Sequence, residues 1–197
     1  MLSLFSRLVP LILVASVLAV PLSQARSAPP SPLPPNEPGF HPLQQMYYLK
    51  QAKTDVERIG VLWKKGVANQ EEKLKSMRRA VASIQGTLFL AYVDAPSDVG
   101  PQFRELTREH DIDVLWVVEN DGIVDAATPR QYLITNALKQ GIPLVAPTEA
   151  WVSEGAPMAV RKVGDQFHIM LNERTAAATA LDVPAEYESV TKLVASN

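Results

Sequence analysis

The stretch that most constrains the fold is Ile112–Gly122, with the sequence IDVLWVVENDG. Its residues Val114–Val118 form an unbroken apolar run, preceded closely by Ile112. Such a run is typical of a strand in a parallel sheet whose two faces are both covered by helices. The run ends at the polar tip Glu119–Asp121. Because ligands of open α/β sheets bind beyond the carboxyl ends of the strands, we expect this tip to lie at the binding edge.

Three further apolar segments share this strand-like character, and helix-like segments separate all four. The predicted strands are Ile59–Trp63, Thr87–Val93, Ile112–Val118 and Ile142–Ala146. Short connections and right-handed crossovers then favour a parallel sheet with helices on both faces. The predicted fold class is α/β, with three α/β/α layers around a mainly parallel sheet of four to five strands. The apolar residues that mark the intervening helices at helical spacing are Leu74, Met77, Val81, Ile84, Val99, Phe103, Leu106, Leu133, Ile134, Ala137 and Leu138.

Polar residues and proline predict where two of these helices begin. Asn69 is expected to cap the first, with Glu71 and Glu72 in its acidic first turn. Thr128 and Pro129 are expected to be the N-cap and first residue of the third.

The remaining parts of the domain are a leading helix and a C-terminal hairpin with helices. A helix is predicted over Pro42–Val56 from the spacing of its apolar residues. Gly164-Asp165 separates two apolar runs, Pro157–Val163 and Gln166–Leu171, which indicates a hairpin. Two helices are expected to follow, one capped by Asn172 over Glu173–Ala180 and a final short one over Glu186–Val194.

The first 25 residues have the features of a secretory signal peptide. Arg7 provides the positive charge, Leu8–Val20 the apolar region, and Ser23-Gln24-Ala25 the small residues of a cleavage site. The apolar run is shorter than the roughly 20 residues that a spanning helix needs, so no stable membrane span is expected after cleavage. We expect export to a bacterial periplasm, a Pro-rich flexible linker over residues 26–41, and a folded domain over residues 42–197.

Composition excludes several classes of function. The chain has 197 residues, of which 47% are hydrophobic, and it carries a net charge of −2. That balance supports a globular core and gives no indication of nucleic-acid binding. The absence of cysteine excludes disulfides, thiolate catalysis and cysteine-bound metal.

The motifs of several enzyme and cofactor classes do not fit. Lys64 and Lys65 occupy the position where a phosphorylated receiver domain needs paired acids, and a dinucleotide-binding turn needs more than Gly66. Ser153 is not bracketed by the strand and helix of a nucleophile elbow. The histidines His41, His110 and His168 are isolated from one another, so no metal site is predicted. We expect no catalytic residues and no cofactor.

Polar side chains follow the predicted strands at their carboxyl ends. Asp94 follows the second strand, Asn120 and Asp121 follow the third, and Thr148 follows the fourth. Trp151 lies in the next segment, where it is suited to stack on a ligand, fill a partner surface or cap the sheet edge. These five residues are the predicted ligand-binding set for a small polar solute. The alternative is that these loops are polar only because loops lie at the surface.

Four segments in this order resemble one family. They are Arg58–Trp63 (RIGVLW), Ile112–Val124 (IDVLWVVENDGIV), Lys139–Ala146 (KQGIPLVA) and Gln166–Val183 (QFHIMLNERTAAATALDV). Together they resemble the second lobe of periplasmic ABC-transporter substrate-binding proteins of the type-1 fold, over roughly Val56–Glu186. In those motifs, Asn172 matches the asparagine before the alanine-rich helix.

The resemblance implies a non-catalytic protein that binds a small solute between two lobes. This chain matches one lobe only, so we expect an ABC permease, a sensor or a second copy to complete the site. The resemblance implies ligand-facing roles for Asn120 and Asp121, with Thr148 and Trp151 behind them. A second hypothesis remains open: an accessory protein of an ABC-transport or redox system that has lost ligand binding. It would dock on its partner through Tyr47, Tyr48 or Trp151.

Overall fold

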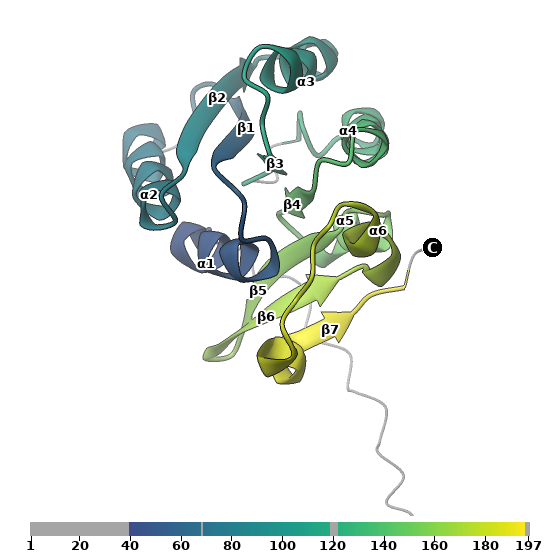
Figure 1. The fold of residues 1–197 in the computed structure, drawn as a ribbon. Helices are drawn as coiled ribbons and strands as arrows, with labels where there is room; N and C mark the ends of the chain where they lie inside the picture. The colour runs from purple at the N-terminus through teal and green to yellow at the C-terminus, as the bar shows by residue number, and fades with distance from the viewer. Residues whose placement is uncertain (1–39, 68, 119–121, 196–197) are drawn as a thin grey trace, which may run out of the picture. The chain divides into compact units, whose positions relative to one another are not determined.

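A single seven-stranded sheet, in the order β2-β1-β3-β4-β5-β6-β7, forms the centre of the domain (Figure 1). The computed structural model describes residues 40–67, 69–118 and 122–195. Strands β1 to β5 are all parallel, β6 is antiparallel to β5, and β7 is parallel to β6. The strands are β1 (Arg58–Lys64), β2 (Thr87–Val93), β3 (Val114–Trp116), β4 (Leu144–Ala146), β5 (Met158–Val163), β6 (Gln166–Leu171) and β7 (Thr191–Leu193).

Helices cover both faces of this sheet, which confirms the predicted α/β/α layers. Figure 1 shows α1 and α2 on one side of β1 and β2, and α3 and α4 on the other. Two buried clusters correspond to these faces, one with residues of α1, α2 and α6 and one with residues of α3, α4 and α5. Within the described residues, no helix combines the length and apolar character needed to span a membrane. The helices are α1 (Pro42–Ala52), α2 (Gln70–Ser83), η1 (Pro96–Asp98), α3 (Val99–Arg108), α4 (Ala127–Lys139), α5 (Glu149–Ser153), α6 (Glu173–Ala178) and η2 (Ala185–Val190).

Burial on both faces explains the apolar run that surrounds β3. Val114, Trp116 and Val118 pack in the cluster on the α1 and α2 side. Leu115 and Val117 alternate with them and pack under α3 and α4. Each of the five side chains is at most 5% exposed. Alternation along a strand therefore divides one continuous apolar run between two helical layers.

The glycine in the RIGVLW motif allows β1 to lie close to Ile112, two residues before β3. A Cβ atom on Gly60 would come within 2.6 Å of Ile112 Cδ1. No side chain fits at that distance without moving Ile112, which is 4% exposed and packed under α3 and α4. The missing side chain thus sets how tightly the central strands pack.

The prediction of four to five strands and of a final helix needs correction. The predicted hairpin around Gly164-Asp165 forms, but β5 and β6 extend the main sheet. The predicted helix over Glu186–Val194 is wrong, since η2 ends at Val190 and is followed by β7. Strand β7 pairs with Ile169–Leu171 of β6. Pairing with a distant strand thus determines the structure of this segment, and local periodicity cannot reveal it.

One predicted helix start is right in position and the other is wrong. Asn69 is the N-cap residue of α2, with Glu71 and Glu72 in the first turn, but it has a left-handed backbone (φ 56°) and makes no side-chain capping bond. Helix α4 begins at Ala127, so Thr128 and Pro129 lie inside its first turn. Proline is still tolerated there because the first-turn N–H groups have no partner within the helix. The leading helix ends at Ala52, four residues before its predicted end.

Asn172, by contrast, caps α6 as predicted. Its Oδ1 accepts the backbone N–H of Thr175 at 3.3 Å, and its Nδ2 donates to the carbonyl of Val152 at 3.1 Å. The side chain is 2% exposed. This asparagine therefore connects the start of α6 to α5 inside the fold, which gives a structural reason for its place in the motif.

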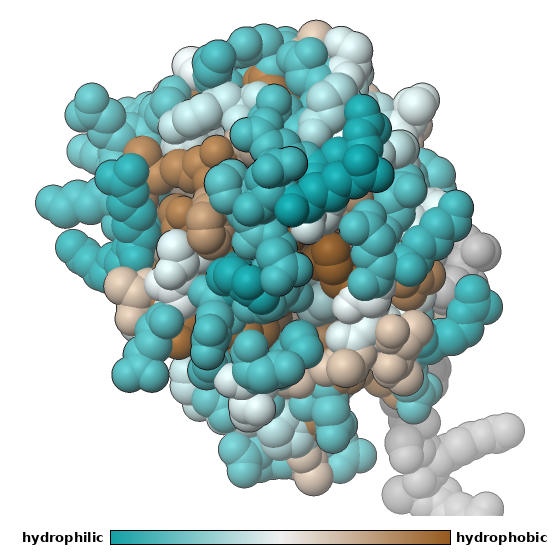
Figure 2. All heavy atoms as spheres, turned by 45° about the horizontal axis from the view of Figure 1, so that its top comes forward, coloured by the Kyte–Doolittle hydropathy of each residue, from teal (hydrophilic) through white to brown (hydrophobic). Residues whose placement is uncertain are grey.

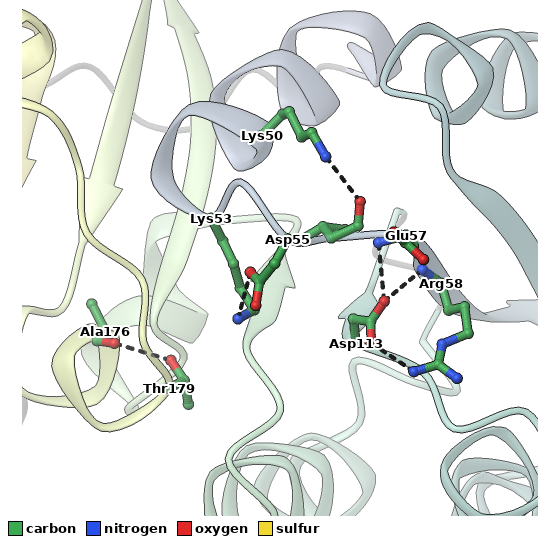
Figure 3. Close-up of polar contacts among 9 residues, drawn as sticks. Lys50, Lys53, Asp55, Glu57, Arg58, Asp113, Ala176 and Thr179 are labelled. Atoms are coloured by element: carbon green, nitrogen blue, oxygen red, sulfur yellow. Dashed lines mark hydrogen bonds and ion pairs between the residues drawn. The ribbon is translucent and has the colours of Figure 1, made fainter.

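A partly buried carboxylate joins the starts of β1 and β3 at the amino ends of the strands (Figure 3). Asp113 Oδ2 accepts the backbone N–H groups of Glu57 and Arg58, at 3.0 and 2.8 Å. Its Oδ1 accepts from the Arg58 guanidinium at 3.1 Å. Burial raises the pKa of the Asp113 carboxyl, but these three hydrogen bonds together outweigh it, so the pKa is lowered.

Replacing Asp113 should therefore destabilise the domain far more than replacing its neighbour Asp111. Asp113→Asn keeps one acceptor oxygen for the backbone N–H groups but removes the charge and places an amide NH2 against the Arg58 guanidinium, and we expect a loss of about 1–3 kcal/mol in the free energy of unfolding. Asp111 is 78% exposed and also pairs with Arg58, so Asp111→Asn should cost less than about 0.5 kcal/mol. Urea denaturation at pH 7 measures both, and equal losses would contradict the assignment.

The lowered pKa of Asp113 also sets the direction of a pH effect. A carboxyl whose pKa is lower in the folded state stabilises the fold above its unfolded pKa of about 3.9. That stabilisation should be lost as the pH falls below this value toward the lower folded pKa. The stability difference between the wild type and Asp113→Asn should accordingly shrink below about pH 4.

Candidate functional site

The carboxyl ends of β2, β1, β3 and β4 lie along one edge of the sheet, because these strands are parallel neighbours. From β1 the chain winds outward to β2, and it then crosses to β3 on the other side of β1 (Figure 1). The boundary between β1 and β3 is thus the switch point at which open α/β sheets form a crevice for ligands.

The predicted site residues are spread along this edge. Asp94 follows β2 and is 64% exposed, with Lys65 Nζ 3.3 Å from its Oδ2. Thr148 is half-buried and precedes α5. Asn120 and Asp121 lie outside the described residues. The ends of β2 and β4 are three strand spacings apart, about 14 Å, so a ligand that contacts both Asp94 and Thr148 would have to span this distance.

Trp151 lies in α5 and is fully buried under the sheet. Its indole N–H donates to Asp125 Oδ1, and the same carboxylate lies 3.3 Å from Arg130 Nη1. The Arg130 guanidinium lies 5.9 Å from the centre of the indole ring. These contacts connect α5 to the start of α4. A direct contact between Trp151 and ligand stays a prediction.

A small hollow opens at the same edge, between the turn after β2 and the first turns of α3 and α4. Its volume is about 290 Å³, at the small end of the range of ligand pockets. The wall is mainly apolar, and the Ser97, Thr128 and Tyr132 side chains bring hydroxyl groups to it. The lining residues are Pro96, Ser97, Val99, Gly100, Thr128, Pro129 and Tyr132. We call this the α3–α4 hollow.

Hydrogen bonds hold two walls of the α3–α4 hollow in place. Asp98 Oδ2 accepts the backbone N–H groups of Asp94 and Ala95 at 3.0 and 2.9 Å, and these bonds lower the pKa of Asp98. On the opposite wall, Arg104 Nη1 donates to Tyr132 Oη at 3.3 Å. The hollow is therefore formed before any ligand arrives, which reduces the entropic cost of binding.

Gly100 helps to keep this hollow open. A Cβ atom at this position would lie 3.4 Å from Arg104 Nη1 and 3.6 Å from Tyr132 Cζ. One added methyl group therefore fits, whereas a longer side chain would extend into the hollow. Sequence reasoning missed Gly100 and Tyr132. Their only sequence signal is that each lies in a helix that follows a strand of the central sheet.

The surface beside this edge is mostly hydrophilic. Figure 2 turns the α3 end of the domain toward the viewer and shows hydrophobic side chains in small, separate areas among polar ones. A broad apolar patch is typical of large protein interfaces. The face in this view is better suited to a small ligand.

Comparison with known proteins identifies the fold. No protein-family model matches the sequence, and no curated protein matches it. A domain from Streptococcus pneumonia, solved in complex with L-Trp, has a TM-score of 0.64 at 14% identity over 78% of this chain. A substrate-binding protein with adhesive properties from Clostridium difficile, solved ligand-free and open, has a TM-score of 0.60 at 16% identity over 78% of this chain.

A conserved domain protein from Vibrio cholerae has a TM-score of 0.64 at 16% identity, again over 78% of this chain. The chain spans 61%, 59% and 60% of the lengths of these three proteins. The fold is thus that of the periplasmic-binding-protein-like class, to which ABC-transporter solute-binding proteins belong.

The Trp151–Asp125 contact can be tested by two variants of one residue. Asp125→Ala leaves the buried indole N–H without its acceptor, and we expect a loss of about 2 kcal/mol in the free energy of unfolding. Asp125→Asn keeps an acceptor oxygen and should lose less than half as much. Thermal and urea unfolding measure both variants. Equal losses would show that the hydrogen bond to Trp151 contributes nothing distinct from the ion pair with Arg130.

Proposed function

We propose that this chain is an exported, non-catalytic solute-binding lobe that holds its ligand at the carboxyl edge of β1 and β3. The observation that carries this proposal is the α3–α4 hollow, which is lined by residues that follow β2 and by the start of the helix that follows β3, at the carboxyl edge where open α/β sheets bind ligands. The fold shared with solute-binding proteins supports the same role.

The lining of the hollow supports a ligand that combines a small apolar body with at least one polar group. The apolar body would contact Val99, Pro129 and the Tyr132 ring, while Ser97 and Thr128 would bind the polar group. Asp94, Asn120, Asp121 and Thr148 would contribute from the neighbouring loops. An amino acid fits this description, and the similar Streptococcus pneumonia domain was solved with L-Trp.

A single lobe leaves one side of such a ligand in water. The affinity should then be weak, with a dissociation constant on the order of millimolar, unless a second surface closes over the ligand. We propose an ABC permease, a sensor or a second copy of the chain as that surface. Export to the periplasm follows from the signal-like features of residues 1–25.

Filling the hollow should abolish ligand binding without unfolding the domain. We expect Gly100→Leu to occupy the space beside Tyr132, whereas Gly100→Ala adds one methyl group that fits. A screen of amino acids, sugars and inorganic ions by thermal shift would first identify a ligand. A tenfold excess over its dissociation constant stabilises by about 1.4 kcal/mol, or about 2–5 °C for a domain of this size.

The Gly100→Leu variant should then lose this shift, and Gly100→Ala should retain it. A ligand-induced shift that persists in a folded Gly100→Leu variant would place the binding site elsewhere. If no compound in the screen shifts the wild type, the solute-binding proposal fails.

The second candidate function is an accessory protein that docks on a partner, and one surface favours it. Tyr47 on α1 is 47% exposed, and its hydroxyl lies 2.7 Å from that of Tyr187. Tyr48 packs edge-on against both rings. Exposed tyrosines are common in protein interfaces. Trp151 is buried and does not contribute to such a surface.

A further inference from the structure

A second and larger hollow lies at the C-terminal edge of the sheet, on the face that carries α6. Its volume is about 780 Å³. The walls are α6, the segment Leu181–Ala185, Glu188 of η2, and the last two strands of the sheet, β6 and β7. We call it the C-terminal groove.

The floor of the C-terminal groove is apolar. Leu171, Ala176 and Leu181 line it and are buried in the core on this face. Leu193 of β7 also lines it and is 60% exposed, which makes it the most exposed large hydrophobic residue of the described chain. Covering an exposed leucine with an apolar group of a partner removes apolar surface from water and so stabilises the complex.

Carboxylates surround this floor. Glu173, Asp182 and Glu188 line the groove, and none forms an ion pair with a residue in the described ranges 40–67, 69–118 and 122–195. Some carboxylates elsewhere are neutralised: Glu149, for example, pairs with both Arg161 and Lys192. The groove is thus an apolar surface with negative charge at its rim, complementary to a positively charged segment with apolar side chains.

Strand β7 also leaves one side of its backbone unpaired with the sheet. Among the strands that the structure describes, it is the last in the order, and its one partner there is β6. The N–H of Val194 donates to the carbonyl of Leu171. Since successive residues of a strand direct their backbone groups to opposite sides, those of Leu193 face away from β6. This edge is able to accept a further strand.

We propose that the C-terminal groove and the β7 edge bind an extended segment of a partner protein that carries Lys or Arg beside apolar residues. The segment would add to the sheet next to β7, cover Leu193 with an apolar side chain, and direct its cations to Glu173, Asp182 and Glu188. Main-chain hydrogen bonds would contribute affinity, and the charges at the rim would select the sequence.

The Pro-rich stretch of this chain has the wrong chemistry for this groove. Residues 26–41 contain no Lys, one Arg at their start, Arg26, and one acid, Glu37. Their many prolines have no N–H to donate to a strand edge. The groove also lies on the opposite face of the sheet from the α3–α4 hollow. Partner binding there is thus separable from solute binding.

A labelled heptapeptide of the sequence Lys-Leu-Lys-Val-Lys-Leu-Lys serves as the probe, with fluorescence anisotropy as the measurement on the full chain. We expect binding at 50 mM salt that weakens at 500 mM, as charge screening requires. The double variant Glu173→Lys, Glu188→Lys should weaken binding by at least about tenfold. The matched control Glu71→Lys, Glu72→Lys on α2 changes the net charge equally and should stay within about twofold of the wild type.

A second variant and its matched control test the apolar contact with Leu193. Leu193→Asp should weaken the probe by about tenfold or more, whereas Leu43→Asp, at a position that is 42% exposed on α1, should have little effect. Circular dichroism would establish that all variants remain folded.

Several outcomes would overturn the proposal. The first is no binding to the wild type, and the second is equal weakening by the two charge variants, which would indicate non-specific attraction. A third is equal binding of the acidic counterpart Glu-Leu-Glu-Val-Glu-Leu-Glu. A fourth is a wild-type dimer that Leu193→Asp dissociates, since the groove would then bind a second copy. None of these outcomes affects the test of the α3–α4 hollow, which uses different residues and a different ligand.

Discussion

The structure depends on the burial of the central strands β1 and β3 between two helical layers. Trp63 and Trp116 pack on the side of α1 and α2, while Leu62 and Leu115 pack under α3 and α4. All four side chains are at most 2% exposed. Burying such large side chains on both faces stabilises the sheet. Only the two ends of its strands then remain for the connecting loops. The functional surfaces are consequences of this arrangement.

The two ends of the parallel strands have different roles. At the amino ends, Asp113 joins β1 to β3 through backbone N–H groups and the Arg58 guanidinium, in a cluster that also includes the Lys53–Asp55 ion pair (Figure 3). At the carboxyl ends, the strands lead into turns that form the α3–α4 hollow. Polar groups at the first edge pair with one another, whereas at the second edge the hydroxyl groups of Ser97, Thr128 and Tyr132 line a hollow that a ligand can enter.

Much of the fold could be predicted because its signals are local. The apolar run ending at Val118 and the hairpin at Gly164-Asp165 each follow from a few neighbouring residues. Strand β7 could not be predicted, since Thr191–Leu193 becomes a strand only through pairing with β6.

The α3–α4 hollow could not be predicted either. It depends on how α3 packs against α4, which brings Gly100 to Tyr132. Trp151 is close to the expected edge, but its contact with Asp125 required the tertiary structure.

The most direct test of solute binding at the α3–α4 hollow is a titration of the 15N-labelled chain with L-tryptophan, followed by the backbone amide chemical shifts. The account predicts the largest changes at Ser97, Gly100, Thr128 and Tyr132, with smaller changes at Asp94 and Thr148. The largest changes at the opposite edge, around Asp111 and Gln140, would contradict it.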